Sequence, residues 1–215
     1  MIRYFFAALL LLAATTALAQ RGTSEFYAGP VFTDGKSYSF QGGTDVRTDT
    51  GYGFLLGFGH KFNPKVSGAI ELEWGNNDYR ATVQPGTANP NAAATVNGRI
   101  DSWTVRFLGT YNFTTGPLTP FVTGGLGWTY VDTNIPSGLP ENVCWFYPWV
   151  GEVCTAVTPT HTTTKFSYNA GGGLRYDFGT NYFVRGLLNV QWVDFGGSFG
   201  TTELTQARID FGLRF

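Results

Sequence analysis

The chain ends in Leu204-Thr-Gln-Ala-Arg-Ile-Asp-Phe-Gly-Leu-Arg-Phe215. Every second residue of this stretch, from Thr205 to Phe215, belongs to a mostly apolar set. The intervening set carries Arg208, Asp210 and Arg214. A period of two residues indicates a β-strand with one apolar and one polar face. An apolar face must be covered either by a protein core or by lipid. How often the pattern recurs along the chain therefore bears on which of the two covers it.

The first 19 residues have the build of a secretory signal peptide. Arg3 supplies a positive charge, residues 4–14 form an apolar run, and Ala17-Leu-Ala19 offers a small-x-small cleavage site. We expect cleavage after Ala19, which makes residues 1–19 the signal peptide and residues 20–215 a single domain. An uncleaved anchor is the alternative.

The composition points to an exported membrane protein. Glycine accounts for 29 of 215 residues, aromatic residues for 17% and charged residues for only 13%, whereas charged residues usually make up about a quarter of a chain. The net charge of −1 leaves no basic footprint for nucleic acid. Beyond the signal, no apolar run approaches the ~20 residues of a transmembrane helix. Such a chain can still cross lipid as a closed barrel, because closure satisfies every backbone group.

Alternating segments recur along the whole chain and give eight strand candidates. They cover residues 25–32, 51–62, 66–74, 102–113, 118–132, 166–178, 182–192 and 204–215. We expect tight turns at residues 63–65, 114–117 and 179–181. We expect irregular loops over residues 33–50, 76–98, 134–163 and 194–203, because these are polar, Pro- or Thr-rich and without periodicity.

The aromatic residues of the apolar faces fall into two belts. Near the long loops lie Tyr52, Trp74, Trp103, Trp128, Tyr130, Tyr168 and Trp192, and near the short turns lie Phe62, Tyr111, Phe113, Tyr176, Phe178, Tyr182 and Phe215. Aromatic girdles at both interfaces, with loops long on one side only, are typical of an outer-membrane barrel. A soluble β-sandwich has no reason to place rings by depth.

The opposite faces carry charges that we assign to the lumen: Lys61, Glu71, Glu73, Arg106, Arg175, Asp177, Arg185, Arg208, Asp210 and Arg214. An eight-stranded barrel is just wide enough for side chains to fill it, and buried charges must be paired. We predict that Glu71 and Glu73 pair with Arg106, and that Asp177 and Asp210 pair with Arg175, Arg185 or Arg208. The result is a polar plug; the alternative is a narrow, gated conductance that prefers anions.

The terminal stretch Arg208-Ile-Asp-Phe-Gly-Leu-Arg-Phe215 resembles the last strand of small outer-membrane barrels. Pro120-Phe-Val-Thr-Gly-Gly-Leu-Gly127 and Tyr168-Asn-Ala-Gly-Gly-Gly-Leu-Arg175 are similar to the OmpA-like and opacity-type eight-stranded family. The resemblance implies an all-β, antiparallel, up-and-down transmembrane β-barrel in the cell outer membrane, with extracellular loops and both termini periplasmic. It also implies contact with outer-membrane lipid and lipopolysaccharide, and a Phe215 read by the barrel-assembly machinery. We expect no appended peptidoglycan-binding domain.

Cys144 and Cys154 lie in the third long loop, and export permits a disulfide between them. Its closure would stabilise the loop by about 2–3 kcal/mol. Metal binding is not expected, because only His161 lies nearby. Between the cysteines an apolar cluster forms either a loop cap or a contact patch for a surface ligand: Trp145, Phe146, Tyr147 and Trp149.

Some small barrels modify lipid A with a His, a Ser and an acidic residue at the outer rim. This chain has only two histidines: His60 falls near the short-turn end, and His161 is followed by threonines. We therefore predict a non-catalytic integral outer-membrane protein without cofactors, whose four surface loops serve envelope structure, adhesion or recognition. The alternatives are a narrow porin-like channel and, after it, a lipid A-modifying enzyme.

Overall fold

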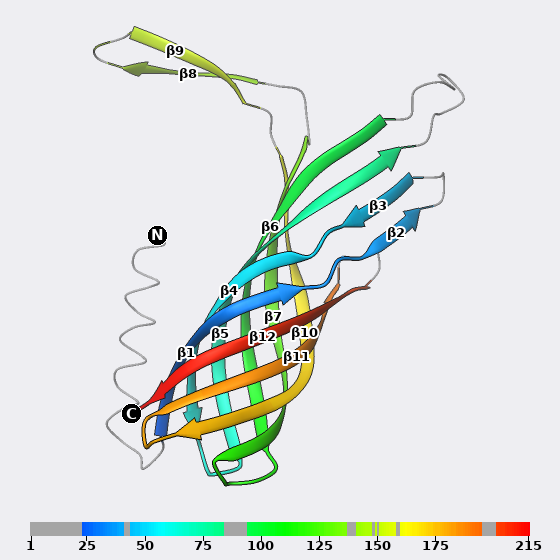
Figure 1. The fold of residues 1–215 in the computed structure, drawn as a ribbon. Coiled ribbons are helices and arrows are strands. Elements are labelled where there is room, and N and C mark those ends of the chain that lie inside the picture. Colours follow the sequence, from blue (N-terminus) through cyan, green and yellow to red (C-terminus); the bar gives the residue numbers. More distant parts are fainter. Residues whose placement is uncertain are drawn as a thin grey trace.

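The computed structural model describes residues 23–40, 44–83, 94–136, 141–147, 149, 151–157, 160–194 and 201–215. Eight long antiparallel strands close into one barrel (Figure 1): β1 (Thr23–Thr33), β4 (Gly51–Lys61), β5 (Val66–Val83), β6 (Ala94–Asn112), β7 (Leu118–Pro136), β10 (Thr160–Phe178), β11 (Tyr182–Asp194) and β12 (Thr201–Arg214). The expected signal peptide lies outside the described residues. Among the described residues, no helix is long and apolar enough to span a membrane.

The first and last strands close the barrel. β1 pairs with β12 on one side and with β4 on the other, so that Phe26 lies opposite both Leu213 and Phe58. Ser24 and Phe215 exchange two backbone hydrogen bonds of 3.0 Å. β12 thus has a partner on each edge, and its apolar face is exposed on the outside of the barrel, with Phe211 61% exposed. The predicted all-β, eight-stranded, antiparallel barrel is confirmed.

The two ends of the barrel differ. At one end, which we call the turn end, short turns join β4 to β5, β6 to β7 and β10 to β11. The side-chain oxygen of Asn63 accepts bonds from the backbone N–H groups of Lys65 and Val66 (2.9 and 2.8 Å), which fixes the first of these turns. Gly179 has a φ of 69° in the third, a value that glycine adopts at little cost. We call the opposite end the extension end.

At the extension end several predicted loops are strands. β5 and β6 continue their pairing through the region expected to be a loop, from Asn76↔Asp101 to Val83↔Ala94. Two hairpins were missed as well: β2 (Ser37–Phe40) with β3 (Thr44–Thr48), and β8 (Glu141–Tyr147) with β9 (Gly151–Val157). These predictions of irregular loops were wrong. Residues 78–83 and 94–101 do alternate polar and apolar residues, but the phase differs from that of the apolar segments before and after them, so the pattern was read as a loop.

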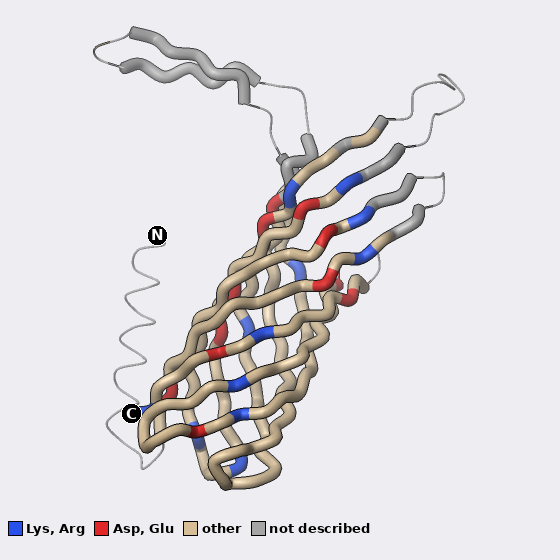
Figure 2. Tube along the Cα trace, viewed as in Figure 1, with Lys and Arg blue, Asp and Glu red and all other residues tan. Residues whose placement is uncertain are grey.

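The outer surface of the barrel is apolar between two belts of rings. At the extension end Trp74 packs edge-on against Trp103, with ring centroids 5.1 Å apart. At the turn end Tyr111 packs on Phe113 at 5.6 Å. Between the belts, the outward-facing positions of all eight described barrel strands carry no Asp, Glu, Lys or Arg, and Leu188 there is 68% exposed. On the outward face, charges begin beyond the extension-end belt, where Asp101 precedes Trp103 by two residues and Asp132 follows Tyr130 by two, as expected where hydrocarbon gives way to water. Figure 2 shows the charged positions along the strands.

A small apolar core lies inside the barrel, and the alternation analysis missed it. It joins the fully buried side chains of Tyr27, Val31, Leu55 and Phe183. The ring of Tyr27 lies against lumen-facing Gly57, where an added Cβ would collide with it, and the ring of Phe183 lies against Gly212 in the same way. Glycine on the lumen face therefore provides the room that these rings occupy.

Candidate functional site

Glu71 is the centre of an ion-pair cluster halfway along the lumen. Its side chain is 1% exposed and contacts three guanidinium groups: Arg106 (Nε–Oε2, 3.6 Å), Arg185 (Nη2–Oε1, 3.2 Å) and Arg208 (Nη2–Oε1, 2.5 Å). The hydroxyl of Tyr27 also donates to it, at 2.8 Å. All five residues are at least nine-tenths buried, so each charge depends on its protein partners.

Two further carboxylates complete this central cluster. Asp210 accepts bonds from Nε of Arg185 (2.7 Å) and Nη2 of Arg208 (3.0 Å). Glu73 forms an ion pair with Arg106. Three arginines thus face three carboxylates, and the central cluster has no net charge.

A second cluster lies at the turn end of the lumen. Glu25 accepts two bonds from Arg175, from Nη1 at 2.8 Å and Nη2 at 2.7 Å. Lys61 contacts the same carboxylate at 3.3 Å. Asp177 accepts from Nη2 of Arg175 at 2.9 Å and from Nη2 of Arg214 at 2.5 Å. We refer to these five residues as the turn-end cluster.

The arginines also fix the buried rings. The guanidinium carbon of Arg185 lies 3.8 Å from the centroid of Tyr27, and that of Arg175 lies 3.7 Å from the centroid of Phe183. Such cation–π contacts gain strength when water is excluded. The apolar core and the two charge clusters therefore form one packed unit.

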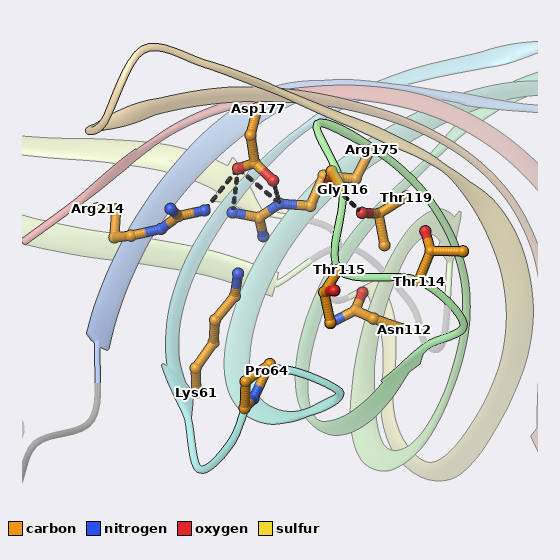
Figure 3. Close-up of a pocket in the computed structure, with 10 residues that line it drawn as sticks. All are labelled: Lys61, Pro64, Asn112, Thr114, Thr115, Gly116, Thr119, Arg175, Asp177 and Arg214. Carbon is orange, nitrogen blue, oxygen red and sulfur yellow. Dashed lines mark hydrogen bonds and ion pairs between the residues drawn. The ribbon is translucent and has the colours of Figure 1, made fainter.

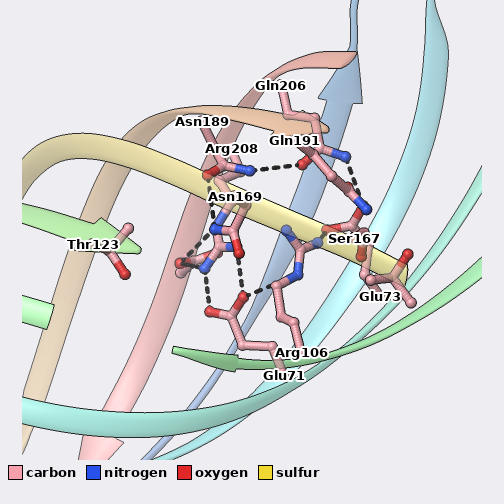
Figure 4. Close-up of polar contacts among 12 residues, drawn as sticks. Glu71, Glu73, Arg106, Thr123, Ser167, Asn169, Asn189, Gln191, Gln206 and Arg208 are labelled. Atoms are coloured by element: carbon pink, nitrogen blue, oxygen red, sulfur yellow. Dashed lines mark hydrogen bonds and ion pairs between the residues drawn. The ribbon is translucent and has the colours of Figure 1, made fainter. Parts of the chain in front are cut away.

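Neutral polar side chains fill the lumen towards the extension end (Figure 4). A chain of amides runs from Asn169 to Asn189 (3.0 Å), from Asn189 to Gln206 (3.1 Å) and from Gln206 to Glu73 (2.7 Å). Together with the charge clusters they form three successive polar layers, which we call the lumen plug.

The structure brings together the pairs that we expected from the sequence. Glu71 and Glu73 lie beside Arg106, Asp177 lies beside Arg175, and Asp210 lies beside both Arg185 and Arg208; Arg214 joins Asp177 and Glu25. Sequence reasoning did not include Glu25. Its inward position could have been inferred, because Phe26 and Phe32 set the outward face of β1.

The cysteine-containing loop is a hairpin. β8 and β9 place Cys144 directly opposite Cys154, with Trp145, Phe146 and Tyr147 paired to Val153, Glu152 and Gly151. The side chains of these hairpin residues lie outside the described part of the chain. Trp149, between the two strands, is 96% exposed.

The contacts of His60 are with a serine hydroxyl and an aromatic ring. Nδ1 of His60 lies 3.4 Å from Oγ of Ser24 at the turn end, and its ring packs against Phe62. The side chain of His161 lies outside the described part of the chain. Among the described residues, no group of three or more His, Cys, Asp or Glu side chains could hold a metal ion.

A closed barrel with an apolar exterior and a polar, filled interior defines a transmembrane β-barrel. The model of one family, the outer membrane protein beta-barrel domain, matches residues 5–215. The chain belongs to that family. No curated protein matches the sequence.

Solved structures share the fold at low sequence identity. Neisserial surface protein A (NspA) has a TM-score of 0.52 at 11% identity, covering 89% of this chain and 95% of NspA. OprG from Pseudomonas aeruginosa has a TM-score of 0.50 at 15% identity, covering 90% and 96%. The attachment invasion locus protein Ail of Yersinia pestis, solved with the heparin analogue sucrose octasulfate, has a TM-score of 0.47 at 13% identity, covering 91% and 100%.

Proposed function

We propose that this outer-membrane β-barrel is a non-catalytic surface protein, in which a plugged barrel anchors extended strands and loops that serve envelope structure, adhesion or recognition. The observation that carries the proposal is the contrast between the lumen of the barrel and its extension end. The lumen is filled by side chains that form ion pairs and hydrogen bonds with one another, whereas the extension end presents long strands and an almost fully exposed Trp149.

The orientation follows from the same contrast. A spanning strand needs about 9–11 residues, whereas β6, β7 and β10 each have 19. The excess length lies at the extension end, and outer-membrane barrels have their short turns in the periplasm and their longer connections outside. We therefore place the extension end outside the cell. The turn end, with the C-terminal strand, then lies in the periplasm. Phe215, 62% exposed at that end, is available to the barrel-assembly machinery.

The lumen plug argues against a channel. An ion crossing the barrel would have to displace the arginines of the central cluster from Glu71 and Asp210, and such separation of buried pairs costs several kcal/mol. We expect purified protein in planar bilayers to show no discrete conductance steps. Regular openings would contradict the plugged state.

The hairpin β8–β9 is the part that we propose for recognition. The predicted patch of Trp145, Phe146, Tyr147 and Trp149 lies on or between its strands, and aromatic residues are enriched at binding hot spots. The register of Cys144 opposite Cys154 suits a disulfide that would hold the two strands together. Lipopolysaccharide and outer-membrane lipid surround the barrel in this arrangement.

The test compares attachment of bacteria that display the protein with attachment of bacteria that lack it, on cultured epithelial cells. The W145A/W149A variant should lose the attachment that the protein confers. Arg99→Ala, an exposed change on β6, is the matched control and should retain it. Equal attachment by both variants would remove the patch from the proposal, and an altered lipid A mass on expression would contradict the non-catalytic assignment.

A further inference from the structure

A cavity of about 130 Å³ opens at the turn end of the lumen, which has room for several water molecules. The ends of β4, β6, β10 and β12 and the turn between β6 and β7 surround it (Figure 3). Its wall includes Lys61, Arg175, Asp177 and Arg214 of the turn-end cluster. None of the functions proposed above uses this cavity.

The charges beside the cavity do not balance. The central cluster has three arginines and three carboxylates. The turn-end cluster has three cations, Lys61, Arg175 and Arg214, but its carboxylates are only Glu25 and Asp177. Within the turn-end cluster, cations therefore outnumber carboxylates by one, and this excess lies beside the cavity.

Hydrogen-bond donors remain on the cations that carry this excess charge. Lys61 has three N–H donors and, among the described residues, only Glu25 as an ion-pair partner. Arg214 directs Nε at Glu25 and Nη2 at Asp177, which leaves Nη1 as a further donor. The carboxamide of Asn112, a residue only 4% exposed, also lines the cavity. In Figure 3 the amino group of Lys61 points into this space.

We propose that the turn-end cavity binds one carboxylate group, held by Lys61 and Arg214. A single negative charge makes the turn-end cluster neutral and matches the donors described above, because planar carboxylates suit guanidinium and ammonium donors. A phosphate dianion would exceed the available positive charge and would lie beside Glu25 and Asp177. Charge balance therefore favours a monoanionic carboxylate over phosphate.

The chain offers a sharp test, because it has only four lysines, at positions 36, 61, 65 and 165. The full-length processed protein, labelled with ¹³C-lysine and refolded in detergent, gives one Cε signal for each. The Lys61→Gln variant assigns the Lys61 signal. On titration with sodium acetate, that signal should shift and saturate while the others do not. Sodium chloride at equal ionic strength should not reproduce the shift.

A second measurement tests the charge count. Acetate should raise the urea midpoint of unfolding in the wild-type protein and in Lys36→Gln, a matched change at the extension end, but not in Lys61→Gln, where the turn-end cluster is already neutral. Ligand that binds only the folded state stabilises it in this way. N-acetylalanine, tested in parallel, distinguishes a peptide carboxyl terminus from a free acid: a lower saturating concentration than acetate indicates the peptide source.

Three outcomes would overturn the proposal: uniform movement of all four lysine signals, no saturation, or an equal midpoint shift in Lys61→Gln. A shift with phosphate but not with acetate would overturn the assignment to carboxylates. The surface function proposed above concerns the opposite end of the barrel, so its success or failure is independent of these results.

Discussion

Replacing Glu71 by glutamine removes one charge from the most buried part of the lumen plug. Glu71 is the only carboxylate in contact with all three arginines of the central cluster. In the E71Q variant, Arg106, Arg185 and Arg208 would face only Glu73 and Asp210. The glutamine amide would also direct N–H donors at guanidinium groups, which cannot accept them.

The expected loss follows from the burial of the site. Breaking a buried ion pair by removing one partner costs about 3–5 kcal/mol, because a buried charge is left uncompensated. We expect E71Q to lower the free energy of unfolding by that amount. The assay is urea unfolding in lipid vesicles, followed by tryptophan fluorescence and by the heat-modifiable mobility of the folded barrel. A double variant, E71Q/R208Q, restores the balance of two arginines and two carboxylates and should recover part of the loss.

Asp101→Asn is the control for this prediction. Asp101 forms an ion pair with Arg99 at 3.1 Å, but both side chains are more than half exposed, and such surface pairs contribute less than about 1 kcal/mol. If E71Q cost no more than Asp101→Asn, or if the double variant were the sum of its single changes, pairing inside the plug would not stabilise the barrel.

Three further predictions concern other parts of the molecule. Gly57→Ala should lower the free energy of unfolding by about 1–3 kcal/mol, because its Cβ collides with the ring of Tyr27, whereas Gly186→Ala, with open space around the added Cβ, should change it little; urea midpoints compare the two. Leu126→Arg, on the outward face and 56% exposed, should cost about 2–4 kcal/mol in lipid vesicles, and an equal cost for Thr95→Arg on the extended part of β6 would contradict the assigned lipid-facing surface. Cys144 and Cys154, opposite one another in β8 and β9, should react with an alkylating agent only after reduction; mass spectrometry of the intact protein would detect free thiols if the disulfide were absent.

The barrel was predictable from sequence because lipid imposes a strict two-residue period. Every outward position from Trp103 to Phe113, for example, is apolar or glycine, and the same requirement acts on all eight strands. Charge location was predictable for the same reason, since a charge on such a strand has only the inward face available. This is why Arg106 can be proposed from the sequence as a partner of Glu71. The contacts of Glu71 with Arg185 and Arg208 were not predicted, because alternation gives the face of a charge but not its depth relative to distant strands.

The extension and the inner core were not predictable in this way. Beyond Trp74 the alternation reverses its phase: Asp78 and Arg80 share the face of Trp74, whereas Tyr79, only 5% exposed, lies on the other face. A search for one continuous apolar face therefore stops at Trp74, although β5 stays paired to β6 as far as Val83. Inside the barrel, Leu55 and Phe183 are apolar residues on the polar face. Alternation places such residues on the polar face without showing that they are buried. The burial of Phe183, for example, depends on Gly212, against which its ring packs, and on Arg175, whose guanidinium lies over the ring.

The length of the strands has a consequence for what the protein can contact. Strands of 19 residues exceed the ~11 needed to span by about 8, which at ~3.3 Å per residue corresponds to roughly 26 Å along the strand. Maintaining paired strands over that distance costs conformational entropy that loops of the same length would not lose. In the proposed surface function, the hydrogen-bonded ladders of β5–β6 and β7–β10 would serve as spacers that hold a recognition surface away from the lipid headgroups. A closed barrel with a packed, ion-paired interior suits this role, because such a base would keep the spacers in fixed relative positions.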